Sequence, residues 1–176
     1  IFAQKREKLA RKKRMSKKNN LNVLYPPEID LTLLLDHYNA GRNGPALNLA
    51  QAMTRRFPKF SMGWQILAAL FQQTGNLDDA LSADLKAAEL SPQDPMVHKT
   101  LGNTYFQLCL FDKAIKSYKR CLSLAPQLAE VHYNLGTSLL KLDKPASAEQ
   151  SLKKAISLNS TYIEAFYNLA DCQKSL

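Results

Sequence analysis

The side chains best suited to metal or redox chemistry in this sequence are two histidines and three cysteines. His98 and His132 lie 34 residues apart, and imidazole nitrogens are common zinc ligands. The same place one interval earlier and later carries Trp64 and Phe166, so we expect both histidines to pack between helices instead. The three cysteines are Cys109, Cys121 and Cys172, and no two of them have the CxxC spacing of a zinc site. The sequence predicts no metal and no cofactor, and the odd number of cysteines indicates reduced thiols in a cytoplasmic protein.

Catalytic motifs do not occur in the sequence either. The chain has no glycine-rich phosphate loop, no HExxH motif and no GxSxG motif. Asparagine and glutamine recur instead, and each amide offers a donor and an acceptor to a peptide backbone. We therefore expect no catalytic residue and no enzymatic activity in this chain, and a binding site built from amides.

A repeat of 34 residues fixes the elements that must position these amides. Leucines and small residues recur at this interval: Leu67, Leu101, Leu135 and Leu169, then Ala46, Ala80, Ala114 and Ala148. A period of this length is typical of a stacked array, in which each unit buries its apolar face against its neighbours. Such arrays commonly bind other proteins, so the repeat bears on function as well as on fold.

Each unit has the pattern of two helices joined by a short turn. Between residues 61 and 94, Leu67 and Phe71 lie on the apolar stripe of a first helix. Gly75 provides the turn that ends this helix, and a second helix runs on until Pro92. In the three units between residues 61 and 162 the eighth and twentieth places are small, so we expect the two helices of each unit to approach closely there. In the unit before them, Leu34 replaces the small residue of the eighth place.

The strong positive charge lies in an N-terminal tail. Residues 1–20 hold nine lysines and arginines against Glu7, a balance of +8, so the rest of the chain contributes only +1 to the formal charge of +9. We expect residues 1–26 to form a basic, disordered extension. Met15 could be a natural start, and we hypothesise that residues 1–14 are not native.

The tail also supports a competing function. Its lysines and arginines within residues 5–18 suit a nucleic acid or an anionic surface, because clustered cations release counterions from phosphates. No apolar run reaches the roughly 18 residues of a membrane span. The sequence thus predicts no membrane span, and a nucleic-acid partner only through residues 5–18.

The repeat resembles the tetratricopeptide repeat family in residue identity as well as in spacing. The motif recurs as Trp64-x2-Leu67-Ala68-x2-Phe71, Leu101-Gly102-x2-Tyr105 and Leu135-Gly136-x2-Leu139. This resemblance implies an all-α fold, in which tandem helix-turn-helix units form a right-handed superhelical solenoid with a concave groove. It divides the chain into a degenerate first repeat, three full repeats and the first helix of a truncated or capping repeat: 27–60, 61–94, 95–128, 129–162 and 163–176.

The concave groove of such an array is lined by the first helix of each pair. We expect the residues that alternate with its apolar stripe to bind a peptide: Gln65, Lys99, Asn103, Phe106, Tyr133, Asn134, Thr137, Lys141, Tyr167, Asn168 and Asp171. Amides suit an extended peptide backbone, and tyrosines add flat area with a polar tip.

Two narrower resemblances concern this groove. Lys99, Asn103 and Asn134 fall where chaperone-binding members of the family clamp a C-terminal carboxylate, but the two remaining cationic places hold Glu164 and Asn168, which argues against a clamp. Asn134 and Asn168 also resemble the asparagine ladder of O-linked N-acetylglucosamine transferases. The repeats look like the N-terminal arms of bacterial glycosyltransferases and sulfotransferases of that kind.

The sequence therefore predicts a protein–protein interaction module that binds a protein or peptide in its concave groove. One alternative is an acceptor-docking arm of a larger glycosyltransferase or sulfotransferase, and a weaker one is an adaptor acting through the basic tail. The last copy keeps its apolar places up to Leu169, so we expect either a final solvating helix or an array cut from a longer chain. An exposed apolar end of this kind could also pair with a second copy of the chain.

Overall fold

The computed structural model describes residues 25–175, and in this part of the chain all regular structure is helical. Its helices are α2 (Glu28–Asn39), α3 (Asn43–Arg56), α4 (Ser61–Gln73), α5 (Leu77–Leu90), α6 (Pro95–Gln107), α7 (Phe111–Leu124), α8 (Ala129–Leu140), α9 (Pro145–Leu158) and α10 (Ile163–Ser175). The predicted all-α class is confirmed. The basic cluster of residues 5–18 and the hypothesis on residues 1–14 lie outside the described residues.

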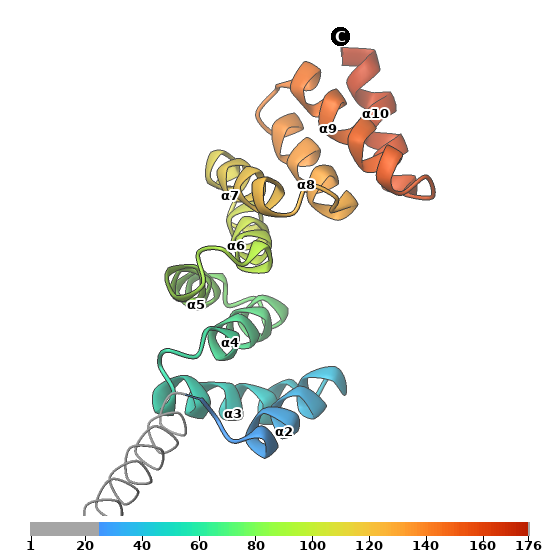
Figure 1. The fold of residues 1–176 in the computed structure, drawn as a ribbon. Coiled ribbons are helices and arrows are strands. Elements are labelled where there is room, and N and C mark those ends of the chain that lie inside the picture. The colour runs from blue at the N-terminus through green and yellow to red at the C-terminus, as the bar shows by residue number, and fades with distance from the viewer. Residues whose placement is uncertain (1–24, 176) are drawn as a thin grey trace, which may run out of the picture.

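The helices pack as successive pairs along an elongated array, with α2 and α10 at opposite ends (Figure 1). Packing is most extensive within the pairs α4–α5, α6–α7 and α8–α9. The first helices also contact one another, α4 with α6, α6 with α8 and α8 with α10. These contacts bring the first helices side by side, so their side chains form one continuous face.

Small residues allow close contact inside the pairs, as the sequence predicts. Gly102 on α6 lies under the ring of Tyr118 on α7, and a Cβ atom there would lie 2.5 Å from the ring carbon Cε1. One repeat later, a Cβ atom on Gly136 would lie 2.7 Å from Cγ of Leu152. Ala114, at the twentieth place, is fully buried. The interior is therefore filled at these places by the partner helix, with no room for a larger residue.

The turns inside the pairs share one backbone conformation. Positive φ angles occur at Gly41 (67°), Gly75 (76°), Cys109 (58°) and Asp143 (54°), which are spaced by one repeat. The N–H of the residue after each of them donates to a carbonyl in the last turn of the preceding helix, as from Leu110 to Tyr105 at 2.9 Å. Cys109 and Asp143 thus adopt a conformation that favours glycine, and the turn is retained without it.

The two histidines anchor loops between pairs. Nε2 of His98 lies 2.9 Å from the carbonyl oxygen of Pro92, and Nε2 of His132 lies 3.0 Å from that of Pro126. Trp64, at the same place, donates from Nε1 to the carbonyl of Pro58 at 2.9 Å. A ring nitrogen at this place of the repeat therefore hydrogen-bonds the preceding loop to the first helix of the next pair, a role that the sequence did not reveal.

Candidate functional site: the concave groove

A cavity of about 350 Å³ opens where α4, α6, α7 and α8 meet. We call it the groove pocket, and it is lined by eight residues: Gln72, Asn103, Phe106, Gln107, Tyr118, Tyr133, Asn134 and Thr137. Its walls combine amides and hydroxyls with three aromatic rings. Cavities of this size with a few convergent polar groups are typical of ligand sites.

The structure brings together five of the eleven residues expected from the sequence. Asn103, Phe106, Tyr133, Asn134 and Thr137 all line the groove pocket. The other six do not line it: Gln65, Lys99, Lys141, Tyr167, Asn168 and Asp171.

The expected residues that do not line the groove pocket are bound to other side chains or exposed to solvent. Gln65 donates to Oδ2 of Asp94 at 3.1 Å. Asp171 lies 3.7 Å from Nζ of Lys174. Lys141, Tyr167 and Asp171 are exposed, with 70% of Tyr167 accessible to solvent. Asn168 remains connected to the pocket, because its Nδ2 donates to Oγ1 of Thr137 at 3.2 Å.

Hydrogen bonds join the pocket amides across neighbouring helices. Nδ2 of Asn134 on α8 donates to Oδ1 of Asn103 on α6 at 3.1 Å. The hydroxyl of Tyr118 on α7 donates to the same oxygen at 2.8 Å. With the bond from Asn168 to Thr137, the polar side chains of α6, α8 and α10 are linked to one another. Their orientation is therefore fixed by the protein before any ligand binds.

A second polar network lies behind Gln72. Its Nε2 donates to Oδ2 of Asp84 at 3.2 Å and to Oγ1 of Thr104 at 2.6 Å, and the hydroxyl of Thr104 donates to Asp84. Asp84 and Thr104 are fully buried, and Oδ1 of Asp84 has no hydrogen-bond partner among the described residues. Burial raises the pKa of the Asp84 carboxyl, and the hydrogen bonds from Thr104 and Gln72 oppose this effect.

This acid makes the stability of the array depend on pH. Because the folded-state pKa of Asp84 is raised, the folded chain holds a proton more tightly than the unfolded chain, so stability is lost as pH rises through the folded pKa. Relative to the Asp84→Asn variant, we expect the wild-type free energy of unfolding to fall as pH increases from about 4 towards neutrality. Urea unfolding of both proteins across this range measures the difference. A wild-type free energy of unfolding that stays constant or rises with pH, relative to that of Asp84→Asn, would contradict a raised pKa for Asp84.

The single lysine among the expected groove residues of α6 is already paired. Nζ of Lys99 lies 2.8 Å from Oε2 of Glu130 on α8, and its side chain is 19% exposed. The eight residues of the groove pocket carry no charged side chain. The groove pocket is therefore neutral and polar, unlike a site that attracts a carboxylate through free cations.

Three residues of the groove pocket are not among the eleven expected from the sequence: Gln72, Gln107 and Tyr118. The two glutamines were detectable from the interval, since Gln107 occupies the place of Lys141 one repeat earlier. Gln72 occupies the place of Phe106 one repeat earlier, so the 34-residue interval points to it. Tyr118 lies on a second helix, where an aromatic residue normally fills the core, and it is only 1% exposed. Its hydroxyl reaches the groove because Gly102 leaves space for the ring.

Comparisons with known proteins agree with this architecture. Three family models, each described as a tetratricopeptide repeat, match residues 31–95, 95–128 and 129–162. Together they span residues 31–162, three quarters of the chain. No curated protein matches the chain. In the described residues, no helix is both long and apolar enough to cross a membrane.

Several solved structures share the fold. A MamA crystal structure has a TM-score of 0.78 and 18% identity, covering 84% of this chain and 80% of that chain. PilF of Pseudomonas aeruginosa has a TM-score of 0.75 and 21% identity, covering 84% of this chain and 67% of that chain. The first TPR of Spaghetti (RPAP3), bound to the HSP90 peptide SRMEEVD, has a TM-score of 0.64 and 17% identity, covering 65% of this chain and 91% of that chain.

The family matches extend over the helix pairs that form the groove pocket, and solved arrays of the same fold superpose on most of the chain. With its tandem helix pairs and its 34-residue interval, the chain belongs to the tetratricopeptide repeat family.

Proposed function

We propose that this chain is a protein-interaction module that binds an extended peptide segment in its concave groove. The observation that carries the proposal is the groove pocket, whose neutral amides are held in place by hydrogen bonds beside the rings of Phe106 and Tyr133. Fixed amides can satisfy a peptide backbone without the entropic cost of ordering side chains on binding. The rings offer apolar area for a side chain of the ligand.

The peptide bound to the Spaghetti (RPAP3) repeat supports this class of ligand. That peptide is acidic and ends in Val-Asp, whereas Lys99 here is paired with Glu130. Lys99 is therefore not free to bind the terminal carboxylate of a peptide, and we propose that the ligand of this chain is an internal or uncharged peptide segment.

The alternatives from the sequence have less support. The relatives reported above are not named as transferases, and the acceptor-docking arm stays a prediction. Binding of nucleic acid through residues 5–18 also stays a prediction, as does self-association through α10, where Ile163, Phe166 and Tyr167 are exposed.

Selection from a displayed library of random peptides tests the proposal on the full chain. We expect enrichment of peptides that share an aromatic or large aliphatic residue, and that bind equally well with a free or an amidated C-terminus. The same selection on a Tyr133→Ala variant should not enrich them. Enrichment that depends on a free terminal carboxylate, or that Tyr133→Ala leaves unchanged, would contradict groove binding of this kind.

A further inference from the structure

One groove amide is oriented by a residue of a second helix. Tyr118 is 1% exposed, and its ring covers Gly102 so closely that an added Cβ atom would lie 2.5 Å from Cε1. This packing carries the hydroxyl to Asn103, where it donates to Oδ1 at 2.8 Å. The equivalent place holds Asp84 one repeat earlier and Leu152 one repeat later.

The two hydrogen bonds to Asn103 decide which of its atoms faces a ligand. Both Tyr118 and Asn134 donate to Oδ1, so the carbonyl side of this amide is turned towards the protein. Its Nδ2 makes no hydrogen bond among the described residues, and Asn103 lines the groove pocket. Asn103 is therefore left with N–H donors for a ligand.

The neighbouring amides are fixed with the opposite polarity. Gln72 uses Nε2 for Asp84 and Thr104, which leaves its Oε1 as an acceptor. Asn134 uses Nδ2 for Asn103, which leaves its Oδ1 as an acceptor. Along α4, α6 and α8 the groove pocket thus offers an acceptor, a donor and an acceptor. An extended peptide presents both carbonyls and N–H groups along its edges, so it can satisfy this alternation through its backbone alone.

We propose that Tyr118 is a positioning residue, which holds Asn103 with its N–H donors towards a carbonyl of a backbone-bound extended peptide. The inference rests on the proposed function and deepens it, because it assigns the polarity of the contact and the residue that sets it. The ligand class is a peptide read through its main chain, with an aromatic or aliphatic side chain beside Phe106 and Tyr133.

The test compares Tyr118→Phe with the wild-type full chain. The variant keeps the ring over Gly102 and removes only the hydroxyl, so the unfolding midpoint should change little. We expect its affinity for a library-selected peptide to fall by about three- to tenfold, the value of one hydrogen bond. Tyr105→Phe is the matched control, because the hydroxyl of Tyr105 makes no hydrogen bond among the described residues, and its affinity should equal that of the wild type.

A backbone ester scan separates positioning from general packing. Replacing one peptide amide by an ester removes its N–H and weakens its carbonyl as an acceptor. In the wild type, we expect the ester at the carbonyl bound by Asn103 to weaken binding several-fold, and in Tyr118→Phe this penalty should shrink. Equal ester penalties in both proteins would overturn the inference.

The outcomes also separate this inference from the proposed function. If the selected peptide binds through the groove and the ester penalties are equal in the two proteins, only the role of Tyr118 fails. If no peptide is enriched, or if groove substitutions leave binding unchanged, the proposed function fails and this inference fails with it.

Discussion

Replacing Gly102 by alanine is expected to lower the free energy of unfolding by about 1–3 kcal/mol, the usual cost of overpacking. The added Cβ atom would lie 2.5 Å from Cε1 and 2.6 Å from Cδ1 of Tyr118. The ring cannot move aside easily, because Tyr118 is only 1% exposed and its hydroxyl is bound to Asn103. The α6–α7 pair must therefore separate or the ring must leave its rotamer.

Gly63→Ala is the matched control for this substitution. Gly63 lies in α4, and an added Cβ atom there would lie 3.5 Å from its nearest neighbours, which is ordinary van der Waals contact, so we expect no loss of stability. Urea unfolding followed by circular dichroism measures both changes. The cost of Gly102→Ala should also shrink in a Tyr118→Ala background, because the two residues are in contact. A Gly102→Ala variant as stable as the wild type would show that the helices do not approach as described.

The double substitution Asn134→Ala with Asn168→Ala should weaken binding of a selected peptide by about tenfold or more. A hydrogen bond to a peptide backbone contributes about 0.5–1.5 kcal/mol, and the one that Asn134 offers in the groove pocket is removed. Asn134 also holds Asn103, and Asn168 holds Thr137, so the change additionally loosens two polar side chains of the pocket that remain. Fluorescence anisotropy with a labelled peptide gives the affinity, and urea unfolding confirms that the array is still folded.

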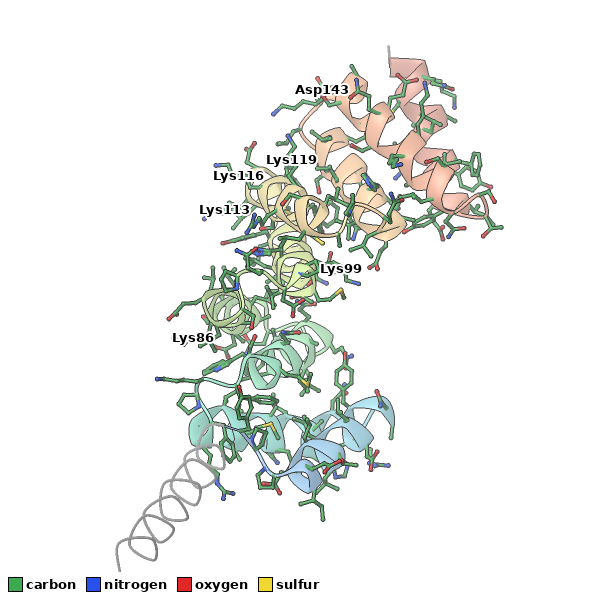
Figure 2. All side chains as sticks on the ribbon, in the orientation of Figure 1. Lys86, Lys99, Lys113, Lys116, Lys119 and Asp143 are labelled. Carbon is green, nitrogen blue, oxygen red and sulfur yellow. The ribbon has the colours of Figure 1, made fainter. Side chains whose placement is uncertain are left out.

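A pair of lysines on the outer side of the array provides the control for this experiment. Figure 2 shows Lys116 and Lys119 along α7, on the other side of the ribbon from Lys99. Both are exposed, and neither has an ion-pair partner among the described residues. Lys116→Ala with Lys119→Ala should leave peptide affinity unchanged. Unchanged affinity in the asparagine variant, or loss of affinity in the lysine variant, would show that the peptide does not bind in the groove.

The repeat was sufficient to predict the fold because its period places each apolar residue on one face of a helix. The positive φ angles follow the same interval, but only at Gly41 and Gly75 does the residue type itself indicate a positive φ angle. Cys109 and Asp143 adopt the turn because the helices on either side impose it. Periodicity thus predicts where a turn lies even where the residue type does not.

The groove was predictable only in part, for a related reason. The helix register determines which residues face inward, so Asn103, Asn134 and Thr137 were found from spacing. The part played by Tyr118 depends on its packing over Gly102, and the pairing of Lys99 with Glu130 depends on how α6 and α8 meet. Such contacts form between different helices, and the spacing of residues along one helix does not predict them.

Mapping a selected peptide on the isotope-labelled full chain by two-dimensional NMR tests the central claim most directly. The account predicts that the side-chain amide signals of Gln72, Asn103 and Asn134 shift on binding, while the backbone signals of Lys116 and Lys119 stay in place. Shifts gathered on the outer side of α7, with the three amide signals unchanged, would contradict a peptide-binding groove.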